Sequence, residues 1–237
     1  MVKMPTDRQD AVEIVQSNRI LVEAHNAGRT YSGQTPVVAL ASATCSVMLG
    51  DRIAITGPSG SGKSTLLYLM GGLETVTSGS LIWPALGPIQ GLRPAKVAFV
   101  FQVPSLLVAL TVIENIELPL LLDNVDKKIA RQAALAALER LDLSGIADNL
   151  PEELSGGQAQ RVAMARALAS QSKLILADEP TGQLDHPTAQ HLFDILLAAI
   201  DGTDTALVVA THDQAVANRL HTIWHMHHGI LEINSKC

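Results

Sequence analysis

Residues 57–65 have the amino-acid types and the spacing of a loop that binds phosphate groups. They fit the pattern G-x-x-x-x-G-K-[ST] at every position. Glycines let the backbone turn until successive N–H groups point at phosphate oxygens, and a helix that begins there adds the positive end of its dipole. Lys63 would reach the β and γ phosphates, and the Ser64 hydroxyl would bind Mg²⁺. The loop consists of Gly57, Pro58, Ser59, Gly60, Ser61, Gly62, Lys63, Ser64 and Thr65.

The sequence on either side of this loop has the order that a phosphate site requires. Residues 52–56 are typical of a buried strand, and residues 64–70 are typical of an amphipathic helix. The alternative is a flexible glycine loop that only joins the strand to the helix, which the complete motif in this context disfavours. The sequence therefore predicts a nucleotide site at the end of this strand.

Two acids that follow another apolar run supply the carboxylates that phosphate chemistry needs. Residues 174–177 are all apolar and end in Asp178 and Glu179. A phosphate loop requires a second site for Mg²⁺, and an acid at the end of a buried strand is the expected form of it, so Asp178 fits. Glu179 is then available to orient, or accept a proton from, the water that attacks the γ phosphate. An exposed acidic turn is the alternative.

Four further positions are ambiguous on residue type alone. Gln102 and His212 each end a predicted strand, so they can border the same cleft or be polar loop residues. Tyr31 can stack on adenine or simply pack as a loop side chain. Residues 154–158 open a predicted helix, where a Ser-Gly-Gly turn can bind an anion or serve only as a helix cap.

Composition narrows the classes of protein. The chain has 237 residues, of which 47% are hydrophobic and 17% charged, enough to fill a sizeable core. Its net charge of −6, without a basic cluster, argues against nucleic acid as a partner. Two cysteines without metal-ligand spacing suit a reducing cytoplasm. Residues 1–18 carry charges throughout and predict a flexible N-terminal extension rather than a signal peptide.

Strands and helices alternate along the rest of the chain. The entry segment predicts three strands, at 20–24, 37–40 and 44–48, with a turn through Gly28 and Gly33. Later strands are expected at 97–101, 174–177 and 206–210. Helices are expected at 127–141, from 158 to about 170, and from the cap at Asp185 to residue 200. The expected apolar face of the 127–141 helix is Ile129, Ala133, Ala136, Leu138 and Leu141.

Two stretches invite other interpretations. Residues 97–113 carry no charge, but Pro104 would break a membrane helix, so a strand followed by a hydrophobic surface loop is predicted. Histidines gather near the C-terminus, yet strand alternation sends His225 and His227 to one face and His228 to the other. A solvated edge strand is favoured there over a metal site.

Taken in order, these motifs resemble those of the ATP-binding subunit of an ABC transporter, over roughly residues 20–232. The matching positions are Tyr31, residues 57–65, Gln102, residues 154–158, residues 174–179 and His212, with Asp185 after the acids. Phe99 to Leu107 and residues 181–185 further resemble the branch that includes lipoprotein-release, macrolide-efflux and cell-division ATPases.

The resemblance implies a P-loop NTPase of the α/β class, with a RecA-like core, an antiparallel β subdomain and an α-helical subdomain. The ATPase domain would span residues 19–237, with the helical subdomain at about 103–165. ATP and Mg²⁺ are the implied ligands, with Ser64, Gln102 and Asp178 on the metal and Lys63, Glu179 and His212 in catalysis. Tyr31 would stack on adenine.

The resemblance also implies partners. Ser155, Gly156, Gly157 and Gln158 of a second copy would complete each nucleotide site, and Asp185 would couple the two sites. A separately encoded transmembrane permease would dock near residues 102–122 and hold the protein on the cytoplasmic face of the inner or plasma membrane. The alternative is a soluble ABC scaffold ATPase of the iron–sulfur assembly type.

Overall fold

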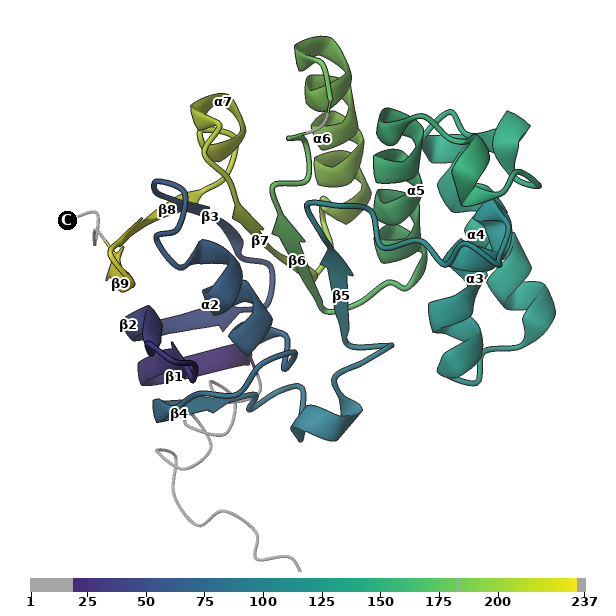
Figure 1. Ribbon diagram of the computed structural model, residues 1–237. Helices are drawn as coiled ribbons and strands as arrows, with labels where there is room; N and C mark the ends of the chain where they lie inside the picture. The colour runs from purple at the N-terminus through teal and green to yellow at the C-terminus, as the bar shows by residue number, and fades with distance from the viewer. Residues whose placement is uncertain (1–18, 183, 234–237) are drawn as a thin grey trace, which may run out of the picture.

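The computed structural model describes residues 19–182 and 184–233, and the expected extension at 1–18 lies outside them. The described residues form one sheet of nine strands with helices on both sides (Figure 1). The strands are β1 Ile20–Tyr31, β2 Val37–Met48, β3 Arg52–Thr56, β4 Ser78–Ile82, β5 Val97–Val100, β6 Leu174–Asp178, β7 Ala206–Ala210, β8 Thr222–His227 and β9 Ile230–Ile233. The α-helices are α2 Lys63–Met70, α3 Val112–Leu122, α4 Lys127–Arg140, α5 Gly156–Ala169, α6 His186–Ile200 and α7 Gln214–Ala217. Short 3-10 turns are η1 Ile89–Gly91, η2 Ser144–Ile146 and η3 Pro151–Glu153.

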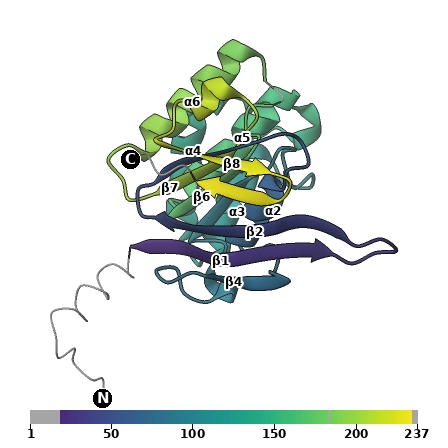
Figure 2. The same cartoon turned by 90° about the vertical axis from the view of Figure 1, so that its left-hand side faces the viewer.

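The sheet order, β4-β1-β2-β9-β8-β3-β7-β6-β5, joins an antiparallel part to a parallel one. Strands β1, β2 and β4 pair antiparallel, whereas β3 runs parallel to β7 and β8, and β6 runs parallel to β5 and β7. Figure 2 shows β1, β2 and β4 side by side, below β8 and β9. Helices α3, α4 and α5 lie together on the side of the molecule opposite the antiparallel strands (Figure 1).

The central strands are buried on both faces, which explains their uninterrupted apolar sequences. In β6, Leu174 and Leu176 belong to the hydrophobic cluster that contains α2, while Ile175 and Ala177 belong to the cluster that contains α5 and α6. Side chains that alternate between the two layers hold helices on both sides. The predicted α/β class, with its antiparallel strands and its group of helices, is confirmed.

The entry segment differs from the prediction, because two long strands replace three short ones. Strand β1 runs through Gly28 to Tyr31, so the expected turn at Gly28 and the loop position of Tyr31 are wrong. Register shifts beside Asn26, whose φ is +47°, let β1 bend without ending. Gly28 serves the close approach of β4, since a Cβ there would lie 2.3 Å from the Ser78 hydroxyl. The glycine marks a strand contact rather than a turn.

The expected strand and hydrophobic surface loop are both present, since β5 is followed by a loop in which Val103 and Val108 are 67% and 76% exposed. Helix α3, which follows this loop, was not predicted. Its start carries a capping box, in which the Thr111 and Glu114 side chains bond each other's backbone N–H groups. Pro119 lies inside α3 and hides its helical pattern in the sequence. Among the described residues, no helix is long and apolar enough to cross a membrane.

The packed face of α4 was predicted correctly at Leu138 and Leu141, which are buried, but not in its first turns. Ile129 is 58% exposed, and the buried residues of the helix are Ala130, Ala134, Ala137 and Leu138. Small alanines let α4 approach α3 and α5 closely, so shape rather than bulk hydrophobicity selects the face.

Strand β8 lies inside the sheet, between β3 and β9, so the predicted edge strand is wrong. Strand β9 pairs with β8 in a C-terminal hairpin, so β8 has a neighbouring strand on each side. His225 is half-buried, and its Nδ1 lies 3.0 Å from the Thr56 hydroxyl. Within residues 19–233, as far as they are described, no group of three or more metal-ligating side chains is found.

Candidate functional site

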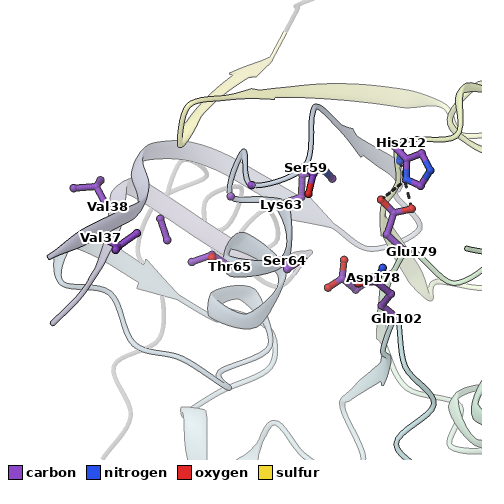
Figure 3. Close-up of a pocket in the computed structure, with 13 residues that line it drawn as sticks. Val37, Val38, Ser59, Lys63, Ser64, Thr65, Gln102, Asp178, Glu179 and His212 are labelled. Atoms are coloured by element: carbon purple, nitrogen blue, oxygen red, sulfur yellow. Dashed lines mark hydrogen bonds and ion pairs between the residues drawn. The ribbon is translucent and has the colours of Figure 1, made fainter. Parts of the chain in front are cut away.

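A cavity of about 610 Å³ opens beside the loop after β3 and the ends of β5, β6 and β7 (Figure 3). It brings together residues from five separate parts of the chain, as expected where parallel strands end at a common edge. They are Val37, Val38, Ala39, Ser59, Gly60, Gly62, Lys63, Ser64, Thr65, Gln102, Asp178, Glu179 and His212.

The glycine loop is pressed against neighbouring strands and can be built only with glycine at two positions. Gly62 has a φ of +104°, and a Cβ there would lie 2.5 Å from the Ala39 carbonyl oxygen. A Cβ on Gly57 would lie 2.2 Å from the Met226 carbonyl oxygen. Helix α2 begins directly after the loop, and Lys63, Ser64 and Thr65 of its first turn line the cavity wall. A helix N-terminus at a cavity wall favours an anion such as phosphate.

Lys63 places a positive charge at the same wall. The side chain is buried, and its ammonium donates hydrogen bonds to the carbonyl oxygens of Gly57 at 2.9 Å and Pro58 at 3.0 Å. Both acceptors are uncharged carbonyl oxygens, and the side chain also lines the cavity that a ligand would enter. The loop, the helix start and the ammonium together fit a phosphate chain.

Asp178 is the buried acid of the site. It is 2% exposed, and burial raises the pKa of its carboxyl, while hydrogen bonds from Ser64 and Tyr68 act in the opposite direction. The Tyr68 hydroxyl lies 3.4 Å from Oδ2 of Asp178. Carboxylate, hydroxyl and amide oxygens are the donors that Mg²⁺ prefers, and Asp178, Ser64 and Gln102 supply them around one cavity. These residues fit the metal predicted from the sequence.

Glu179 and His212 form a hydrogen-bonded pair at the cavity. Nδ1 of His212 lies 2.8 Å from Oε1 of Glu179, and the His212 backbone N–H donates to Oε2 at 3.4 Å. The Glu179 side chain is 12% exposed, whereas that of His212 is 72% exposed. Glu179 has a φ of +46°, a backbone state that costs about 1–3 kcal/mol outside glycine and occurs at functional sites. A carboxylate held in this way can orient a water molecule.

Other predicted site residues lie outside the cavity. Ser155 and Gln158 cap α5 by bonding each other's backbone N–H groups, at 3.2 and 2.8 Å. Asp185 caps α6 by accepting a hydrogen bond from the Thr188 backbone N–H at 3.0 Å. Within one chain these residues act as helix caps. The remaining predicted residues that do not line the cavity are Tyr31, Gly57, Pro58, Ser61, Gly156 and Gly157.

Sequence reasoning missed part of the cavity wall. Val37 and Val38 are 59% and 60% exposed although they lie in a strand, and both line the cavity with Ala39. Exposed valines beside a phosphate loop are suited to contact the flat apolar face of a base. Two β-branched residues directly after the loop at residues 32–36 were the available signal, but β-branched residues are typical of any strand. The Tyr68 contact with Asp178 was also missed.

The fold and the site define a P-loop nucleotide hydrolase. A phosphate loop at a helix start, a buried acid for the metal and a second acid held by a histidine stand at one edge of a mainly parallel sheet. Comparisons with known proteins narrow this class.

The profile of the ABC transporter family matches residues 40–182. A lipoprotein-releasing system ATP-binding protein LolD from Legionella pneumophila (strain Paris) is 42% identical over 222 residues, covering 90% of this chain and 98% of that protein. The LolD of Pseudomonas syringae pv. tomato is 42% identical over 224 residues, covering 91% and 98%. A solved dimeric structure of the ATP-binding cassette MJ0796 in a post-hydrolysis state, bound to ADP and Pi, superposes with a TM-score of 0.83. It is 34% identical and covers 92% of this chain and 100% of that one.

The chain belongs to the ABC transporter family. It is an ATP-binding subunit that hydrolyses ATP with Mg²⁺, as the sequence predicted.

Proposed function

We propose that the residues around the cavity carry out ATP hydrolysis in the roles that their positions support. Lys63 and the loop N–H groups bind the β and γ phosphates, and Ser64, Gln102 and Asp178 hold Mg²⁺. When bound, Mg²⁺ neutralises phosphoryl charge. Glu179 orients the attacking water, and His212 fixes the Glu179 carboxylate through its 2.8 Å contact. Tyr31 stacks on the adenine.

A second copy of the chain completes each site. The observation that carries this proposal is the position of Ser155 and Gly156, which are exposed at the start of α5 and outside the cavity of their own chain. A helix start with exposed backbone N–H groups can contact the γ phosphate bound to another copy, together with Gly157 and Gln158. Asp185 couples the two sites. The solved MJ0796 relative is dimeric, which supports the arrangement.

A membrane permease is the second proposed partner. A groove of about 280 Å³ lies between β5 and α3, and Phe99, Phe101, Leu118 and Leu122 contribute apolar side chains to it. Residues 103–165 form the helical subdomain that carries one wall, and the permease docks near residues 102–122. This places the protein on the cytoplasmic face of the inner or plasma membrane.

The kind of transport follows from the curated relatives. LolD proteins of Legionella and Pseudomonas are named as parts of lipoprotein-releasing systems. The proposed work of this subunit is therefore to drive a membrane protein that extracts or releases lipid-anchored protein from the membrane.

Mixing two inactive variants tests the shared site. Lys63→Ala removes the phosphate ligand of its own loop, and Ser155→Arg blocks the helix start that faces the other copy. Each purified variant alone should hydrolyse ATP at under about a tenth of the wild-type rate. An equal mixture should recover activity, because a mixed dimer contains one site with both Lys63 and Ser155 intact. A mixture no more active than its components would exclude the shared site, provided that mass spectrometry shows mixed dimers.

A further inference from the structure

We infer that Arg29 is a positioning residue that holds the Tyr31 ring ready for the nucleotide base. The guanidinium carbon of Arg29 lies over the ring of Tyr31, 4.8 Å from its centroid. A cation at this distance is attracted by the negative face of an aromatic ring. The inference rests on the proposed role of Tyr31 in binding adenine.

Strand pairing places the ring beside the cavity. Tyr31 at the end of β1 pairs with Val37 at the start of β2, and directly paired residues of antiparallel strands project from the same face. Val37 lines the cavity that contains the phosphate loop. Tyr31 itself is half-buried, so its environment already restricts the ring.

Arg29 is anchored from its other side. Its guanidinium forms an ion pair with Glu74 at 2.5 Å and donates a hydrogen bond to the Thr75 carbonyl oxygen at 3.0 Å. The Arg29 and Glu74 side chains are 20% and 28% exposed, so the pair is partly shielded from water. A guanidinium held at two points cannot easily leave the ring.

The anchor connects the base end of the site to its phosphate end. Glu74 and Thr75 follow α2 closely, and α2 begins with Lys63. The Tyr31 ring is thus positioned relative to the same helix that presents the phosphate ligands. Arg29 covers one face of the ring and leaves the other face to the base. A ring fixed before binding loses less conformational freedom when the base stacks on it.

Equilibrium binding of two probes separates this role from general damage. ADP, which contains the base, and inorganic pyrophosphate, which lacks it, are titrated with excess Mg²⁺ against the full chain. Arg29→Leu should weaken ADP binding about 3- to 10-fold and leave pyrophosphate binding unchanged. In ATP hydrolysis the same variant should raise KM without lowering kcat. Arg19→Leu, a change of the same type at an exposed position, should alter neither probe.

Two conservative variants keep the test decisive if Arg29→Leu folds poorly. Arg29→Lys retains the charge but lacks the planar fork whose two nitrogens contact Glu74 and Thr75, and Glu74→Gln removes the charge of the anchor. Both should give a smaller loss of ADP affinity, again without effect on pyrophosphate. Normal ADP binding by all three variants would overturn the inference. Tighter ADP binding would overturn it too, because it would show that Arg29 competes with the base for the ring.

Tyr31→Ala distinguishes failure of the inference from failure of the adenine role. If Tyr31→Ala loses ADP affinity while the Arg29 variants do not, Tyr31 binds the base without help from Arg29. If Tyr31→Ala binds ADP as wild type does, the adenine role is wrong, and the inference is overturned with it.

Discussion

At the scale of single residues, Asp178 lies in an environment that disfavours its ionised form. Asp178 is 2% exposed, and its pKa is raised, chiefly by burial, with the nearby Glu179 carboxylate adding to the effect. Hydrogen bonds from Ser64 and Tyr68 and the charge of Lys63 offset only part of this. A carboxylate whose ionised form is disfavoured in the metal-free protein is suited to bind a cation.

Asp178→Asn should therefore stabilise the metal-free protein while abolishing Mg²⁺-dependent ATP hydrolysis. The raised pKa means that the folded state favours the protonated acid. The contribution of Asp178 to stability is thus full at low pH and is lost as pH rises through its folded pKa. In EDTA, the unfolding free energy of the variant should exceed that of wild type at pH 8, and the difference should shrink as the pH falls toward 4.

Denaturant unfolding at several pH values measures that difference, with the exposed Asp148→Asn as a control for the loss of one charge. A variant less stable than wild type at pH 8 would contradict the argument from burial.

At the scale of elements, a single buried amide joins the loop after β5 to α3. Asn115 is fully buried. Its side chain accepts a hydrogen bond from the Leu107 backbone N–H at 2.8 Å and donates to the carbonyl oxygens of Leu107, Leu110 and Thr111. On the other side of the loop, Arg166 of α5 donates to the Ser105 carbonyl oxygen at 2.8 Å. The exposed apolar loop is thus held in place by polar side chains from two helices.

Asn115→Ala should destabilise the protein by about 1–3 kcal/mol, because buried backbone groups of the loop lose their partners. The measurement is denaturant unfolding, and hydrogen exchange at Leu107 should rise with it. Asn218→Ala removes an exposed amide at the end of α7 and should change stability by less than about 0.5 kcal/mol. Equal effects of the two substitutions would show that the Asn115 contacts do not support the loop.

At the scale of the whole molecule, the apolar groove between β5 and α3 lies where the sheet meets the helices. These are the two parts that the proposed permease must connect. Phe99 and Phe101 stack with ring centroids 5.2 Å apart at the core side of the groove, and Leu118 and Leu122 come from α3. Tyr68 lies 6.2 Å from both phenylalanine rings and also contacts Asp178. Packed side chains therefore run from the proposed docking surface to the nucleotide site.

Leu122→Glu should reduce co-purification of the membrane subunit by about tenfold, because a charge would enter an apolar interface. Leu122 is 63% exposed in the free subunit, so the change should alter stability and ADP binding little. Leu135→Glu, at a 48% exposed position on α4 outside the groove, is the matched control. Equal recovery of the membrane subunit with both variants would place the docking surface elsewhere.

The sequence by itself determined the elements whose local chemistry is strong. The phosphate loop, the apolar strands that end at Asp178 and at Thr211-His212, and the cap at Asp185 are each specified by neighbouring residues, and the structure contains all of them. The order of the motifs matched a known family, and this resemblance predicted the fold class that the comparisons confirmed.

Only the tertiary structure decided which residues meet. The extent of β1 depends on β4, whose Ser78 contacts Gly28, and the buried face of α4 depends on how closely alanines let it approach its neighbours. Likewise, Val37, Tyr68 and Arg29 gain their positions from partners far away in the chain. Such contacts join residues that are distant in sequence, so no local pattern of hydrophobicity or turn chemistry can specify them.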